Sequence, residues 1–168
     1  MESSAYGTTD LAGPPPEVVE IFQTATRVLV GLALRSMDVL GGAVTLPQFR
    51  MLAVLADTGT ARSSWVAAAL GLKPSAVTRL ADRMVAAGYV TRGSDPANRS
   101  VVTLALTVSG RDLVARGLGW RRQELGRILG QLEVPSDQLA AAAKALTALV
   151  EAVGEGYGTV APLGLMPW

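Results

Sequence analysis

Cysteine and histidine are both absent from this sequence of 168 residues. Without thiol or imidazole groups the chain cannot build a disulfide, a zinc finger, a cysteine-based redox sensor or a Ser-His-Asp triad. The remaining ligands are carboxylates and carbonyls, which disfavours a transition-metal site. The carboxylates are mostly isolated or lie near the ends of the chain, and Glu17 with Glu20 fits a solvated first helical turn. We therefore expect no metal, no cofactor and no catalytic activity.

Long apolar runs are missing as well. The stretch Val28–Leu34 is bounded by Arg27 and Arg35 and is far shorter than the ~20 residues that cross a bilayer. The polar, Gly/Pro-rich start lacks the basic and apolar segments of a signal peptide. These absences predict a cytoplasmic protein with no membrane partner.

The net charge is only +1, but the charges are unevenly distributed along the chain. Residues 58–122 hold ten basic and three acidic groups, a sum of +7, whereas segments 1–57 and 123–168 each sum to −3. A basic middle between acidic ends is typical of a surface that binds a polyanion. Uneven scatter over short windows would give the same numbers, so charge alone leaves both interpretations open.

Hydrophobic periodicity, with glycine and proline at the breaks, predicts a mainly α-helical chain with one small β-hairpin. The expected helices cover 17–40, 45–58, 61–70, 74–87, 107–130 and 135–154, and the expected hairpin covers 89–106. Thr45 and Thr107 are suited to cap the helices that follow them. The segments 1–16 and 155–168 show no period and are read as a disordered arm and a tail.

The stretch from Ser63 to Arg83 has the spacing of a helix-turn-helix. Ala67 lets the two helices approach, and Gly71 permits the left-handed backbone of the turn. Apolar contacts between the two helices are expected from Val66, Leu70, Leu72, Val77 and Leu80. The buried stripe of the second helix is expected to consist of Val77, Leu80, Ala81, Met84 and Val85, and its opposite face presents Ser75, Thr78, Arg79, Asp82 and Arg83. Such a face could read a DNA major groove, although an ordinary amphipathic surface helix has the same pattern.

The hairpin after this motif favours the DNA-binding interpretation over an ordinary surface helix, because a helix, a turn, a second helix and a hairpin in this order make up a winged helix-turn-helix. The hairpin tip carries Asp95, Asn98 and Arg99. A β-loop beside a recognition helix can insert an arginine into the neighbouring minor groove. Asp95 is better suited to shape the turn at Pro96 through a backbone hydrogen bond than to contact DNA.

These motifs resemble the MarR family of bacterial transcriptional regulators between Thr45 and Gly110. The matching pieces are LPQFRML at 46–52, KPSAVTRLADRMVAAGYVTR at 73–92, DPANR at 95–99 and LTVSG at 106–110. The resemblance implies a homodimer that binds a pseudo-palindromic double-stranded DNA operator. It also implies release by a small effector, often aromatic or phenolic.

The wing departs from the family pattern. Family wings commonly carry an Asp-x-Arg pair, and the corresponding positions here are Asn98 and Ser100, with Arg99 between them. Either Arg99 takes the place of the family arginine on a slightly rotated tip, or readout by the wing is weak. We favour the first interpretation, because Asp95 can still brace the loop.

The long terminal helices carry more apolar surface than a small winged domain can bury. The residues concerned are Val108, Leu113, Val114, Leu118, Leu125, Ile128, Leu129, Leu139, Ala142, Leu146 and Leu149. Two copies could bury them together, or the helices could fold back on their own domain; we favour the dimer. Arg27 is a candidate for holding an effector carboxylate, although it could equally pair with an acid at the interface.

The sequence thus predicts a dimeric DNA-binding regulator, and specifically a repressor. The predicted DNA contacts are Lys73, Ser75, Thr78, Arg79, Arg83 and Arg99, with Asp95 and Asn98 shaping the wing. The predicted organisation is an arm (1–16), a first dimerisation helix (17–42), a winged helix-turn-helix domain (43–106), C-terminal dimerisation helices (107–154) and a tail (155–168). The alternative is a winged module that contacts proteins and no longer binds DNA.

Overall fold

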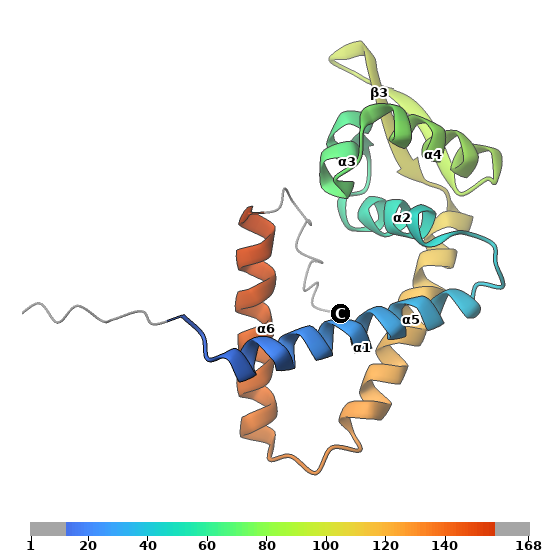
Figure 1. Ribbon diagram of the computed structural model, residues 1–168. Coiled ribbons are helices and arrows are strands. Elements are labelled where there is room, and N and C mark those ends of the chain that lie inside the picture. Colours follow the sequence, from blue (N-terminus) through green and yellow to red (C-terminus); the bar gives the residue numbers. More distant parts are fainter. Residues whose placement is uncertain (1–12, 157–168) are drawn as a thin grey trace, which may run out of the picture.

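The computed structural model describes residues 13–156 and is mainly helical, with one small sheet (Figure 1). The elements are α1 (Pro16–Asp38), α2 (Leu46–Thr58), β1 (Ala61–Arg62), α3 (Ser63–Leu70), α4 (Pro74–Ala86), β2 (Val90–Asp95), β3 (Asn98–Leu106), α5 (Val108–Leu129) and α6 (Ser136–Gly156). The predicted arm before residue 13 and the predicted tail from residue 157 lie outside the described residues. The prediction of a mainly α winged helix-turn-helix fold is confirmed.

Local signals in the sequence mark the helix ends. At the start of α2 the backbone N–H of Thr45 donates to Oε1 of Gln48 at 2.7 Å. At the start of α5 the Thr107 hydroxyl accepts a hydrogen bond from the Gly110 amide at 3.0 Å. Between α3 and α4, Gly71 has a φ of +66°, the left-handed conformation that the tight turn requires. The helix-turn-helix therefore forms where its spacing predicts it.

The sheet has three antiparallel strands in the order β1-β3-β2. The prediction of a helix beginning at Ala61 was wrong, because Ala61 and Arg62 pair with Leu104 and Thr103 instead. This pairing satisfies backbone groups through a distant partner, and two residues are too few to show an alternating pattern. β1 thereby attaches the start of α3 to the base of the hairpin.

The core lies where α2, α3, α4, α5 and the sheet meet. Its most buried members are Phe49, Met51, Leu52, Leu55, Val66, Val77, Met84, Leu104 and Leu113.

Leu113 and Val114 belong to this core, so the prediction that they form dimer surface was wrong. Val85 is 38% exposed, so the prediction that it belongs to the buried stripe of α4 was wrong. Leu72, which was predicted to contact both helices, is 39% exposed. Leu72 follows the left-handed turn, and Val85 lies one residue off the line through Val77, Ala81 and Met84.

A polar contact fastens α1 to α5 at the edge of this core. Nε of Arg121 donates to the hydroxyl of buried Ser36 at 2.6 Å, and the guanidinium carbon lies 5.1 Å from the ring centre of Phe49 on α2. Burial lowers the pKa of Arg121 from its ordinary value. Beside it, Gly117 packs directly beneath the Phe49 ring. The C-terminal half of α1 is therefore attached to the winged part of the chain.

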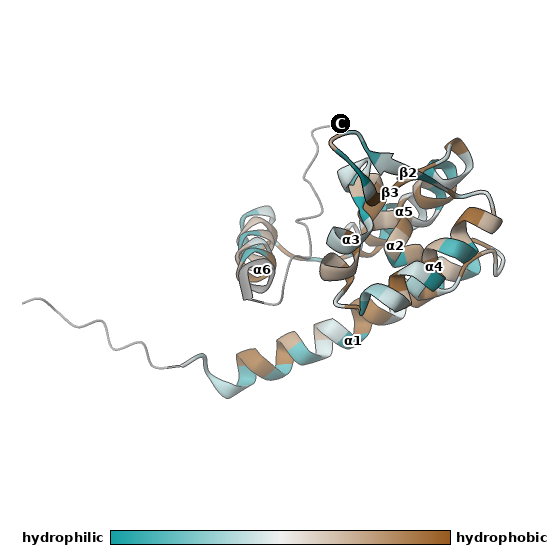
Figure 2. Cartoon of the chain, turned by 90° about the horizontal axis from the view of Figure 1, so that it is seen from above, coloured by the Kyte–Doolittle hydropathy of each residue, from teal (hydrophilic) through white to brown (hydrophobic). Residues whose placement is uncertain are grey.

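The rest of α1 and the whole of α6 extend away from this core (Figures 1 and 2). Large apolar side chains lie exposed on both helices, among them Val18, Ile21, Val28, Leu29, Leu146, Leu149 and Val150. Within residues 13–156 no helix is long and apolar enough to span a bilayer.

Candidate nucleic-acid interface

Helix α4 presents a polar face to solvent. Pro74 occupies its first turn, and Val77 and Ala81 are fully buried against the core. Five of the residues predicted to contact DNA lie on the exposed side of α4 or at its start: Lys73, Ser75, Thr78, Arg79 and Arg83. Asp82 lies on the same side. The β2–β3 hairpin projects beyond α3 and α4 (Figure 1). The structure thus combines an exposed polar helix with a projecting wing.

The charges on α4 are unequally partnered. Asp82 forms a salt bridge with Arg92 of β2 at 2.7 Å, and Arg92 also donates a hydrogen bond to the Thr78 carbonyl at 3.3 Å. In the part of the chain that the structure describes, neither Arg79 nor Arg83 forms an ion pair. The only carboxylate on this face is therefore neutralised, while two guanidinium groups remain available to an external anion. Sequence reasoning missed Arg92, which gave no signal beyond its charge.

Asp95 organises the wing through both of its carboxylate oxygens. Oδ1 accepts from the Ala97 amide at 2.9 Å, and Oδ2 accepts from Nε of Arg62 at 2.8 Å. An amino nitrogen of Arg62 lies 2.7 Å from Oδ2 and completes the ion pair. The Ala97 amide, followed by the Arg62 guanidinium, lowers the pKa of Asp95 below its ordinary value. Asn98 supports the other side of the turn, since its Oδ1 accepts from the Ser100 amide at 3.0 Å. Arg99 lies exposed on the strand that leaves this turn.

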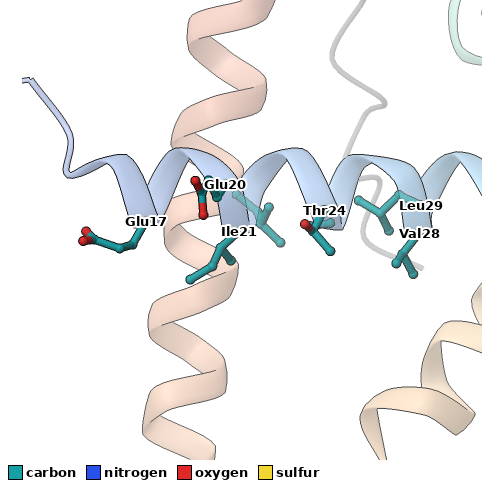
Figure 3. Close-up of a pocket in the computed structure, with 8 residues that line it drawn as sticks. Glu17, Glu20, Ile21, Thr24, Val28 and Leu29 are labelled. Carbon is teal, nitrogen blue, oxygen red and sulfur yellow. The ribbon is translucent and has the colours of Figure 1, made fainter.

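The candidate effector-binding residue, Arg27, lies on α1, outside the α4 face and the wing. Arg27 is exposed on α1 and donates to Oγ1 of Thr24 at 3.1 Å. A groove of about 670 Å³ runs along α1 next to α6 (Figure 3). Its lining consists of Glu17, Glu20, Ile21, Thr24, Ala25, Val28, Leu29 and Leu146, without Arg27. Among residues 13–156 no group of three or more acidic side chains is arranged to hold a metal ion.

An exposed helix with free arginines, a tight glycine turn and a braced β-wing together define a winged helix-turn-helix protein. Residues 44–99 match the model of the MarR family. The HTH-type transcriptional repressor MdtR of Bacillus subtilis is 34% identical over 99 residues, a match covering 59% of this chain and 63% of MdtR. The chain belongs to the MarR family of transcriptional regulators, which confirms the resemblance seen in its motifs.

Solved structures share this fold over most of the chain. The crystal structure of RV1404 from Mycobacterium tuberculosis is 35% identical, with a TM-score of 0.75, covering 85% of this chain and 97% of RV1404. FabT of Streptococcus pneumoniae, crystallised in complex with DNA, has a TM-score of 0.69 at 19% identity, covering 84% of this chain and 99% of FabT. The second likeness establishes the fold alone.

Proposed function

We propose that this protein is a dimeric, sequence-specific DNA-binding regulator that represses transcription in the cytoplasm and has no enzymatic activity. The observation that carries the proposal is the exposed face of α4, on which Arg79 and Arg83 form no ion pair with any residue that the structure describes, while Asp82 is neutralised by Arg92. Arginine can bind guanine through two hydrogen bonds in the major groove. Lys73, Ser75, Thr78 and Arg99 would add contacts to phosphates or base edges.

A related protein and a solved structure of the same fold support this proposal. MdtR is named a transcriptional repressor, and FabT, which has the same fold, was crystallised with DNA. Both properties are carried to this chain as part of the proposal. Repression would follow if the bound dimer covers a promoter.

Dimerisation is proposed through the helices outside residues 43–106. Val28 on α1 is 63% exposed and Val150 on α6 is 52% exposed, whereas the C-terminal end of α1 packs against the core through Met37. A second copy can cover these surfaces, and two-fold symmetry would set the two α4 helices about 34 Å apart, one turn of B-DNA. The dimer would therefore read two half-sites of inverted sequence.

Release by a small aromatic or phenolic effector is the last part of the proposal. α5, itself one of the proposed dimer helices, begins directly after the wing strand β3, and its Arg121 is hydrogen-bonded to Ser36 of α1. A ligand that binds preferentially to one arrangement of these helices would change the spacing of the two α4 helices and hence the affinity for DNA. A thermal-shift screen of phenolic acids, followed by DNA titration with each stabilising compound, tests this step. Compounds that stabilise the protein without weakening DNA binding would contradict it.

Selection of duplexes from a random-sequence library tests the proposal as a whole. We expect the wild-type protein to enrich an inverted repeat with half-site centres about 10 base pairs apart, bound with an affinity that falls steeply with salt. Footprinting of the enriched duplex then locates both half-sites. Enrichment of no sequence would overturn the proposal and favour a winged module that contacts proteins.

Placing a charge on the proposed dimer surface should separate the two copies. We expect Val28→Glu to weaken the dimer by on the order of 100-fold, because a carboxylate buried without a partner costs several kcal/mol. Sedimentation velocity over a concentration series measures the change. Gln23→Glu, exposed on another side of the same helix, is the matched control and should remain dimeric. A Val28→Glu protein that dimerises like wild type would show that this side of α1 stays outside the interface.

A further inference from the structure

Arg62 connects parts of the molecule that sequence reasoning treated separately. It lies on β1, immediately before α3, and its side chain reaches Asp95 at the wing end of β2, 33 residues further along the chain. The two carboxylate contacts, at 2.8 and 2.7 Å, are close and come from two different nitrogens. Both contacts converge on Oδ2, and the charge-assisted hydrogen bond from Nε holds the guanidinium beside the carboxylate.

The two partners of this ion pair differ in exposure. The Asp95 side chain is 13% exposed, whereas that of Arg62 is 60% exposed. The two oxygens of Asp95 are occupied by Arg62 and by the Ala97 amide. Of the five N–H donors of Arg62, the one on Nε donates a hydrogen bond to Asp95, which leaves four donors for an external acceptor. The carboxylate is therefore shielded, while the guanidinium remains open to solvent.

Few charges are available on this wing. Asn98 and Ser100 are neutral, and Arg92 is paired with Asp82. The charged groups that accompany the turn are therefore Arg99, Asp95 and the Arg62 guanidinium. Without Arg62, the Asp95 carboxylate would oppose the approach of a phosphate.

We propose that Arg62 is a DNA phosphate-binding residue, held in position by Asp95, that supplements Arg99 at the wing. The inference rests on the proposed DNA-binding function and extends it to a residue outside both α4 and the hairpin. Phosphate is the acceptor that a fixed, exposed guanidinium with several remaining donors fits best. The contact is independent of sequence and should add to affinity without adding to specificity.

The test measures binding of the selected duplex of about 30 base pairs by fluorescence anisotropy between about 50 and 200 mM salt. Arg62→Gln removes the charge but keeps a side chain that can donate to Asp95. We expect it to weaken binding about 10-fold and to reduce the slope of log K against log[salt] by about 1.8, which is about 0.9 for the phosphate contact of each of the two copies in the dimer. Arg62→Ala should give the same loss of slope. Lys144→Ala, which removes an exposed charge on α6, should change neither quantity.

Asp95→Asn separates a phosphate contact from a purely structural brace. This variant retains the Arg62 charge, so we expect its salt slope to equal that of wild type and its affinity to fall less than that of Arg62→Gln. Equal losses in Arg62→Gln and Asp95→Asn with unchanged slopes would overturn the inference, since Arg62 would then only support the wing. Failure of the proposed function looks different: the wild-type protein itself would then select and bind no duplex.

Discussion

A variant with alanine at both Arg79 and Arg83 is expected to bind the selected duplex at least about 100-fold more weakly than wild type, because each two-point arginine–guanine contact is worth about 1–3 kcal/mol. Both side chains are exposed, and neither forms an ion pair with another residue of the described chain. Their removal should therefore leave the melting temperature unchanged. Anisotropy titration and thermal unfolding, performed on the same preparation, measure the two effects.

Comparing binding to two DNA duplexes of different sequence shows whether the arginines contact bases or phosphates. If the arginines read bases, the double variant should lose most of its preference for the selected duplex over a scrambled duplex of equal length. A uniform loss for both duplexes would instead assign the arginines to phosphates. A matched control removes two other exposed cations, with Arg50→Ala on α2 and Lys144→Ala on α6, and should keep both affinity and preference. A double Arg79 and Arg83 variant that protects the same footprint at the same concentration would refute the recognition face.

Alanine at Gly110 should produce the largest loss of stability. A Cβ atom there would overlap the Tyr89 carbonyl oxygen, which is backbone and already accepts a hydrogen bond from the Thr107 amide at 3.0 Å. Forcing extra volume into a packed site costs about 1–3 kcal/mol, and an unyielding backbone neighbour brings the cost to the upper end. For a chain of this size about 3 kcal/mol lowers Tm by about 6–12 °C. Thermal unfolding at one fixed protein concentration measures the shift.

Two other glycines of α5, Gly117 and Gly119, serve as comparison positions for this prediction. A Cβ at Gly117 would lie 2.7 Å from the buried Phe49 ring, so Gly117→Ala should lower Tm, though less than Gly110→Ala because a side chain can shift. A Cβ at Gly119 would meet no atom within 4 Å, so Gly119→Ala should raise stability by up to about 1 kcal/mol through its better helix propensity. Equal effects of alanine at all three positions would show that helix propensity, and not packing, determines the outcome.

Helix limits and the turn were predictable because their causes are local. Gly71 forms the left-handed turn and Thr107 caps α5, and each acts within a few residues of its own position. The polar face of α4 followed equally from spacing. The contact of its residues with DNA stays a prediction.

The features that were missed connect residues distant in sequence. Arg62 and Asp95 are 33 residues apart, and Ser36 and Arg121 are 85 apart. Nothing in the periodicity of one segment indicates such a partner, because the pairing depends on how the elements pack. The same holds for β1, whose short strand exists only because β3 lies alongside it.

The attachment of Ser36 to Arg121 gives α1 the mechanics of a lever. The helix is clamped near its C-terminal end, and the 20 residues between Pro16 and Ser36 span about 30 Å at 1.5 Å per residue. A rotation of about 10° at the clamp would displace the far end by about 5 Å, comparable to one helical turn. Small adjustments beneath the Phe49 ring would therefore be magnified at the apolar end of α1, and displacements of that end would be reduced in size at the winged domain.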